Sequence, residues 1–92
     1  MKPLKQCRLS GIRSAAQFYE ELARQLDLPV HFGRNLDALW DALSADVEGP
    51  LEIVWQDTQL SRSTMGADYA GLLAVLEEAA AERDDFTLRL LP

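Results

Sequence analysis

The chain has few of the residues that define several protein classes. Its 92 residues include one cysteine, Cys7, and one histidine, His31, and no segment approaches the roughly 20 apolar residues of a membrane span. A lone cysteine forms no internal disulfide, which agrees with a reducing compartment. The first residues lack the apolar core of a secretion signal, so we expect a cytoplasmic protein. No repeat divides the sequence, and its length predicts a single domain over residues 1–92.

Basic residues are scarce and unevenly placed. The formal net charge is −6, from 9 Lys or Arg against 15 Asp or Glu. Residues 1–13 hold four cations and no acid, a charge of +4, so residues 14–92 carry −10. An acidic body repels phosphate backbones and attracts basic proteins, so we expect a basic protein partner and no binding to nucleic acid or membrane. Solubility alone would also explain a net charge of this size.

Hydrophobic spacing predicts alternating strands and helices. Strands are predicted over residues 4–9, 51–55 and 86–90. Helices are predicted after Ser14 and before Pro29, from the Asn35 cap to a point before Gly49-Pro50, over 57–64 and from Asp68 to Arg83. Helical crossovers favour parallel pairing of strands. We therefore predict a two-layer α/β domain whose three-stranded parallel sheet is covered mainly on one face by about four helices, with 51–55 as the natural central strand.

Capping residues predict where these helices begin. Ser14 followed by Gln17 matches a capping box, and Asp57 is predicted to cap the third helix. In the last helix, Asp68 near the start and Arg83 at the end agree with the helix dipole. The buried stripe of that helix is predicted to be Tyr69, Leu72, Leu73, Leu76 and Ala80.

The most informative segment runs from Gly33 to Asp41. Asp37 and Asp41 lie one turn apart on the solvent side of a helix, although like charges at this spacing cost about 0.2–0.5 kcal/mol. Something other than local stability therefore uses the pair. Asn35 suits the helix cap, and Gly33 allows a backbone turn that other residues resist. The apolar stripe of this helix is predicted to be Leu36, Leu39, Trp40, Leu43 and Val47, with Trp40 at its boundary.

A family resemblance rests on this segment and its flanks. Residues 31–41 read HFGRNLDALWD, preceded by Leu28-Pro29 and followed by Gly49-Pro50-Leu51. This pattern resembles the barstar family, intracellular inhibitors of barnase-type ribonucleases, and the resemblance covers nearly the whole chain in element order. It implies a barstar-like fold, no enzymatic activity, and no cofactor or metal. It also implies a one-to-one complex in which the acidic helix and the preceding loop block the ribonuclease active site.

The resemblance further implies roles for the acidic residues. Asp41 matches the carboxylate that stands in for a phosphate of the RNA substrate. Asp37 and Glu78 match flanking acids that meet basic residues of the enzyme, and Glu82 matches a further acid at the rim. A carboxylate fixed on a rigid helix makes charge-assisted hydrogen bonds to such cationic groups at little ordering cost.

Neutral residues around the acids also match the family. Asn35 and Gly33 match the cap and loop that position the backbone, and Trp40 matches a ring at the edge of the contact. His31 stands where the family carries a tyrosine that stacks in the catalytic cleft, so the aromatic contact becomes sensitive to pH.

Other positions depart from the family pattern. Arg34 replaces an acid and Asp46 replaces a tryptophan, while Ala42 and Asp84 stand at the positions of the family's cysteines. Arg34 and Asp46 change the surface that contacts the ribonuclease in this family. They therefore favour an alternative function. In that alternative, a barstar-like module binds a different basic toxin or a regulatory protein.

Without the family resemblance, other interpretations of the acidic residues, His31 and Cys7 remain open. Asp37 and Asp41 also fit a solvated helix face, and a glycosidase pair is disfavoured because both project from one convex face. A metal site of His31, Asp37 and Asp41 matches no recognised ligand spacing. A hydrolase using His31 as general base lacks a nucleophile motif, since Cys7 is expected to be buried and inert. The free protein is expected to be a monomer, with weak dimerisation through Trp40 left open.

Overall fold

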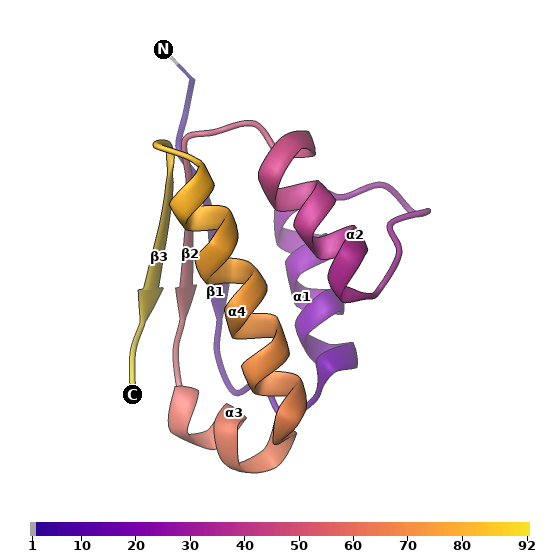
Figure 1. The fold of residues 1–92 in the computed structure, drawn as a ribbon, viewed down its shortest axis with the longest axis vertical. Coiled ribbons are helices and arrows are strands. Elements are labelled where there is room, and N and C mark those ends of the chain that lie inside the picture. Colours follow the sequence, from indigo (N-terminus) through magenta and orange to yellow (C-terminus); the bar gives the residue numbers. More distant parts are fainter. Residues whose placement is uncertain (1) are drawn as a thin grey trace.

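The computed structural model describes residues 2–92 and consists of a parallel sheet with helices against one of its faces (Figure 1). The sheet contains β1 (Lys5–Leu9), β2 (Leu51–Trp55) and β3 (Phe86–Leu90) in the order β1-β2-β3. The α-helices are α1 (Ala15–Leu26), α2 (Leu36–Asp41), α3 (Thr58–Met65) and α4 (Ala67–Glu82), and a π-helix, η1 (Ala42–Asp46), directly continues α2. The predicted fold class and the central position of residues 51–55 are confirmed.

The core lies between the sheet and the α1–α4 layer. α1 packs on β1 and α4 packs on β3, whereas α2 and η1 pack on α4 (Figure 1). Trp55 is fully buried at the centre, with ring centroids 5.1 Å from Phe18 of α1 and 5.0 Å from Tyr69 of α4. Three aromatic residues from separate elements therefore fix how the helices sit on the sheet. Within residues 2–92, no helix combines the length and apolar character needed to cross a bilayer.

A glutamine of α1 covers the outer edge of β1. The side chain of Gln25 accepts a hydrogen bond from the backbone N–H of Arg8 at 2.7 Å and donates one to the Arg8 carbonyl, also at 2.7 Å. These are the backbone groups that a further strand would use for pairing. The glutamine thus satisfies part of an edge that would otherwise be open to another chain.

The start of α1 confirms one half of the predicted capping box. The Ser14 hydroxyl accepts a hydrogen bond from the Gln17 N–H at 3.1 Å. The Gln17 side chain, however, accepts the N–H of Arg13 at 2.8 Å instead of reaching Ser14. The helix ends at Leu26, and Asp27 follows in the left-handed conformation with φ of 54°, so the chain turns before Pro29.

The long helix expected after Asn35 changes its winding after Asp41. The N–H of Val47 donates to the carbonyl of Ala42 at 2.8 Å, a five-residue step that defines the π-turn. Leu39, Leu43 and Val47 are buried as predicted. The prediction that Leu36 is buried is wrong: it is 43% exposed, because the facing residue of α4 is Gly71, which offers no side chain to cover it.

Two expectations for the later helices also need correction. Asp57 occupies the N-cap position of α3 but makes no side-chain cap bond; its carboxylate instead accepts the N–H of Gly11 at 2.9 Å. In α4, Tyr69, Leu72 and Leu76 are buried, but Leu73 and Ala80 are only half-buried and Ala79 takes the buried position.

Arg83 follows the end of α4 and stabilises the end of a different helix. Its Nη1 donates to the carbonyls of Leu43 and Val47, each at 2.8 Å, and its Nε and Nη2 bond both carboxylate oxygens of Asp85. The carbonyls at a helix end lack partners within their own helix. Arg83 therefore joins the end of η1 to the α4–β3 turn.

Ser61 provides a buried polar link whose removal is expected to cost stability. It is fully buried, donates to the Ile12 carbonyl at 2.7 Å and accepts the Trp55 indole N–H at 3.1 Å. Ser61→Ala leaves both groups without a partner, so we expect a loss of about 1–3 kcal/mol in the free energy of unfolding, measured with urea. Ser63→Ala is the matched control, because its hydroxyl bonds the Leu60 carbonyl at an exposed site; a loss as large as that of Ser61→Ala would contradict the assignment.

Candidate functional site

Two open hollows lie on either side of Asp41. The first, here called the helix hollow, has a volume of about 510 Å³ and is lined by Leu36, Asp37, Trp40, Asp41, Val75 and Glu78. The second, the loop hollow, has a volume of about 290 Å³ and is lined by Leu28, Pro29, His31, Phe32, Gly33, Ala38, Asp41, Ala42 and Asp46. Asp41 lines both, so this exposed residue lies where the two hollows meet.

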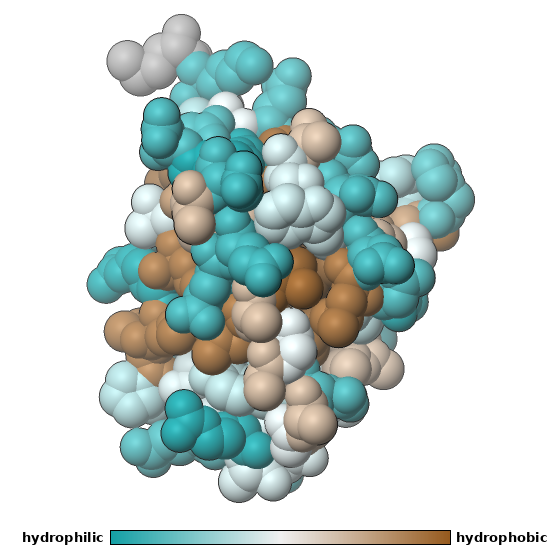
Figure 2. All heavy atoms as spheres, viewed as in Figure 1, coloured by the Kyte–Doolittle hydropathy of each residue, from teal (hydrophilic) through white to brown (hydrophobic). Residues whose placement is uncertain are grey.

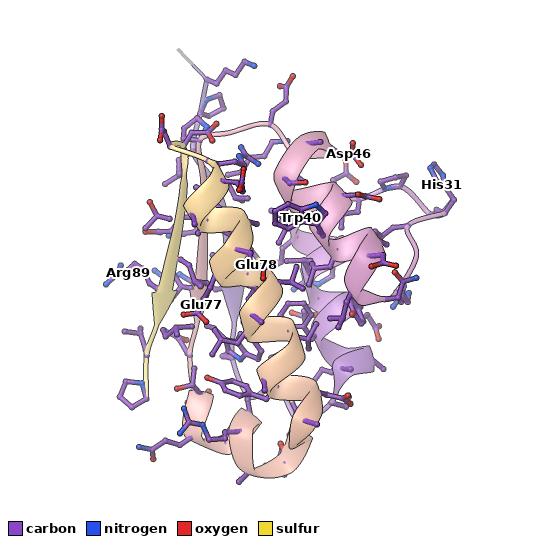
Figure 3. All side chains as sticks on the ribbon, in the orientation of Figure 1. His31, Trp40, Asp46, Glu77, Glu78 and Arg89 are labelled. Carbon is purple, nitrogen blue, oxygen red and sulfur yellow. The ribbon has the colours of Figure 1, made fainter. Side chains whose placement is uncertain are left out.

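The helix hollow forms where α2 packs against α4. The ring of Trp40 lies half-buried between these helices, with Glu78 of α4 beside it (Figure 3). Asp37, Asp41 and Glu78 are exposed and surround an apolar floor that includes Val75. A cationic side chain entering this hollow would place its aliphatic stem on Trp40 and Val75 and its charge among the carboxylates.

The loop hollow forms between α2 and the protruding segment that precedes it. His31 is exposed at the tip of this segment (Figure 3). The N–H of Phe32 donates to the Pro29 carbonyl at 2.9 Å, and the Phe32 ring lies 6.2 Å from that of Tyr19, so both turn and packing hold the loop. Asp46 joins His31 and Asp41 at the opening.

Gly33 lies close to the first turn of α2 and does not adopt an unusual backbone conformation. Gly11 and Gly66 have a positive φ, but Gly33 does not. The backbone turn that only glycine adopts easily, expected at Gly33 from the sequence, is therefore not present. A Cβ at position 33 would instead lie 3.1 Å from Asn35 Nδ2 and 3.2 Å from Ala38 Cβ. The small residue lets the loop approach the first turn of α2 closely.

The remaining predicted residues lie outside the two hollows. Asn35 is confirmed as the cap of α2, since its Oδ1 accepts the Ala38 N–H at 2.8 Å, but it lines neither hollow. Glu82 is exposed on α4, one turn after Glu78, and also lines neither. Arg34 lines a separate hollow with Glu20 and Asp27, on the α1 side of the loop.

The carboxylates of this surface have no internal counter-charge. Within residues 2–92 the ion pairs are Lys2–Glu48, Glu21–Arg24, Arg83–Asp85 and Glu52–Arg89. None of them involves an acid of either hollow. These acids repel one another in the free protein and are available to cations supplied from outside.

Two contacts that shape this region were not recognised from the sequence. Val75 enters the floor of the helix hollow only because α4 packs on α2. Arg83 was assigned to its own helix end, whereas it fixes η1, and its guanidinium holds the pKa of Asp85 below the usual range. The charge and position of Arg83 were visible in the sequence, but its target depends on the π-turn.

The described residues offer no support for the enzymatic and metal alternatives. Residues 2–92 contain no group of three His, Cys, Asp or Glu side chains arranged to hold a metal ion, including His31, Asp37 and Asp41. Cys7 is fully buried, and burial, with a smaller effect of Glu21, raises its thiol pKa to about 12. Such a thiol is not a nucleophile near neutral pH.

Comparisons with known proteins point in one direction. The model of the family described as "Barstar (barnase inhibitor)" matches residues 3–91. A curated protein of Bacillus subtilis (strain 168), named "Putative ribonuclease inhibitor YrdF", is 38% identical over 71 residues, which cover 76% of this chain and 78% of that protein. The matched residues include both hollows and all three strands.

Proposed function

The chain belongs to the barstar family, whose members are inhibitors and not enzymes, and on this premise we propose that it inhibits a bacterial barnase-type ribonuclease. The inhibitor binds the enzyme one to one, as a monomer in the cytoplasm, and protects the cell that makes the ribonuclease. The observation that carries this proposal is the position of Asp41 between two hollows whose acids have no internal counter-charge.

Asp41 acts in this proposal as a substitute for an RNA phosphate. A ribonuclease active site holds cationic groups in place for a phosphate, and these groups donate charge-assisted hydrogen bonds to a carboxylate in the same position. Asp37 and Glu78 meet basic residues at one side, in the helix hollow. His31 and Gly33 face the enzyme at the other side, in the loop hollow, and Glu82 contributes at the rim.

The fold reduces the entropic cost of this contact. Asn35 caps α2, Phe32 and Pro29 close the preceding turn, and Trp40 is held between α2 and α4. The binding groups are thus ordered before the partner arrives, and little conformational freedom is lost on association.

The direct test is an RNA cleavage assay with basic microbial ribonucleases. Stoichiometric loss of cleavage on adding the protein supports the proposal, and unchanged cleavage across barnase-type enzymes overturns it. A neighbouring reading frame for a secreted basic nuclease would identify the first enzyme to assay.

A second candidate is a module of the same fold that binds a different basic toxin or a regulatory protein. The observation that favours it is Asp46, which lines the loop hollow where the family carries a tryptophan. An added acid at this position suits a partner with an additional cation there. Purification of the complex from the native cell, with identification of the bound protein, separates the two candidates.

Association with the ribonuclease is expected to slow as salt is added. The net charge of −6 attracts a basic enzyme before contact, and salt screens this attraction. Raising NaCl from about 0.05 M to about 0.5 M should lower the association rate constant by about tenfold or more, with a smaller change in dissociation. Stopped-flow mixing measures both rates, and an association rate independent of salt would contradict steering by the acidic surface.

A further inference from the structure

A third hollow lies where the beginnings of α1, α2 and α4 meet, outside the surface assigned above. This three-helix hollow has a volume of about 240 Å³ and is lined by Ala15, Tyr19, Asn35, Leu36, Ala67, Asp68, Gly71 and Leu72. It shares Leu36 with the helix hollow and therefore adjoins it along the α2–α4 junction. Figure 2 shows apolar side chains gathered between α4 and α2 in this region.

We propose that the three-helix hollow binds a lysine or arginine side chain of the basic partner, with the stem on Leu36 and Leu72 and the cationic end between Asp68 and the Tyr19 hydroxyl. The proposal rests on the proposed function for the identity of the partner. It extends the interface along α4, away from Asp41 and toward the first turn of that helix.

The walls of the hollow suit an aliphatic stem. Leu36 is 43% exposed at its rim, and Gly71 leaves the opposite wall without a side chain. A Cβ on Gly71 would lie 3.5 Å from Leu36 Cδ1, so the gap between the two helices is about one methyl group wide at this point. Lysine and arginine bury their methylene groups on such apolar surfaces while the charged end stays near polar groups.

The polar groups of the hollow lack partners of their own. Tyr19 is only 6% exposed, yet within residues 2–92 its hydroxyl takes part in no hydrogen bond. Asp68 forms no ion pair there either. Burial, and then the charge of Asp68, raise the pKa of Tyr19, so the phenol stays neutral and its oxygen can accept a hydrogen bond. The hydroxyl oxygen is open to solvent, because residues 2–92 contain no buried side-chain N or O atom without a hydrogen-bond partner, so an incoming N–H donor can reach it.

Helix dipoles act against a cation here, but they are largely compensated. Ser14 caps α1 and Asn35 caps α2, each by accepting a backbone N–H of the first turn. α4 carries Asp68 in its own first turn. The full negative charge of this carboxylate outweighs the partial charges that the capped helix ends retain, so the hollow selects a cation over an anion.

Binding of a cationic side chain is tested first with butylguanidinium, and with butylurea as its neutral analogue. Backbone amide NMR signals of Asp68 and Gly71, which line the three-helix hollow and not the helix hollow, should shift on titration with butylguanidinium and shift much less with butylurea. Asp68→Asn should abolish these shifts, whereas Glu77→Gln, an exposed change on α4 that lines none of the hollows, should retain them. Absence of the shifts, equal shifts with butylurea, or persistence of the shifts in Asp68→Asn overturns the proposal.

The second test uses a ribonuclease that the wild-type protein inhibits. Gly71→Ala narrows the hollow without a clash and favours the helix, so the fold remains intact. Gly71→Ala and Asp68→Asn should each weaken binding by about fivefold, as expected for a partly buried contact. Ala70→Leu, an exposed change on α4 that does not line the hollow, should leave binding unchanged.

The two proposals fail in different ways. If the ribonuclease is inhibited equally well by wild type, Gly71→Ala and Asp68→Asn, the three-helix hollow lies outside the interface and this proposal is wrong, while the proposed function stands. If no ribonuclease is inhibited, the proposed function fails, and the butylguanidinium titration alone decides whether the hollow takes a cationic side chain.

Discussion

Replacement of Asp41 by Ala is expected to weaken ribonuclease binding by about 2–5 kcal/mol, which is about 30- to 5000-fold in the dissociation constant. Asp41 lines both the helix hollow and the loop hollow, so a partner that covers this surface removes its carboxylate from water. Cations of the enzyme that lose this carboxylate would remain buried without a counter-charge. Isothermal titration calorimetry, or titration of RNA cleavage by the inhibitor, measures the loss.

Glu78 provides the control for this prediction. It lines only the helix hollow and is exposed on α4, so solvent and salt screen its contacts. Glu78→Ala should therefore cost about 1 kcal/mol or less. Asp41→Asn, which keeps the shape and removes the charge, should resemble Asp41→Ala. Equal small effects of Asp41→Ala and Glu78→Ala would place the main contact elsewhere on the molecule.

Replacement of Arg83 by Met is expected to lower the free energy of unfolding by about 3 kcal/mol. The Arg83 side chain is only 11% exposed and donates two hydrogen bonds to the carbonyls of Leu43 and Val47 at the end of η1. Methionine fills a similar volume but donates nothing. Unfolding in guanidinium chloride, followed by tryptophan fluorescence, measures the change.

Arg24→Met separates this effect from the loss of an ordinary ion pair. Arg24 and Glu21 bond at 2.8 Å on the surface of α1, with the Arg24 side chain 65% exposed, so solvent screens the pair and it should contribute little to stability. Arg83→Lys should be intermediate, because an ammonium cannot reach two carbonyls and a carboxylate in the same fork geometry. A loss from Arg83→Met no larger than that from Arg24→Met would show that Arg83 does not fix η1.

Acidification supplies a second readout for Arg83. Its guanidinium, hydrogen-bonded to the carboxylate, holds the folded-state pKa of Asp85 below the usual range of an aspartate. The resulting stabilisation is present above the unfolded-state pKa and is lost as the pH falls through the lower folded-state pKa. The stability difference between wild type and Arg83→Met should therefore narrow in acid but not vanish, because the bonds to the two carbonyls do not depend on Asp85.

The sequence was sufficient for features that local pattern controls. Alternation and β-branching located β2 and β3, and the Ser14 and Asn35 caps located the starts of α1 and α2. The helical angles also placed Asp37 and Asp41 on the solvent side, where the structure has them. These features depend on neighbours in the chain, which a single sequence displays directly.

Features that depend on packing between distant segments were not accessible in the same way. Leu36 carries the signature of a core residue but is 43% exposed, and the residue of α4 beside it is Gly71, which has no side chain to cover it. The proximity of Glu78 to Asp41 requires α4 to pack on α2, and the sequence indicated it only through the family resemblance. The interaction of Arg83 with η1 required a change of helical winding that no local propensity signals. The binding roles of the site residues remain predictions until a partner is tested.

The change of winding after Asp41 determines how many acids face the loop hollow. Successive residues of an α-helix are about 100° apart, so two residues separated by five positions point about 140° away from each other. The wider turn through Ala42 brings such residues back to nearly the same side. Asp41 and Asp46 can consequently share one opening, and regular α-helical winding would direct the second carboxylate elsewhere. The geometry of one irregular turn thus sets the local density of negative charge, with no change in amino-acid composition.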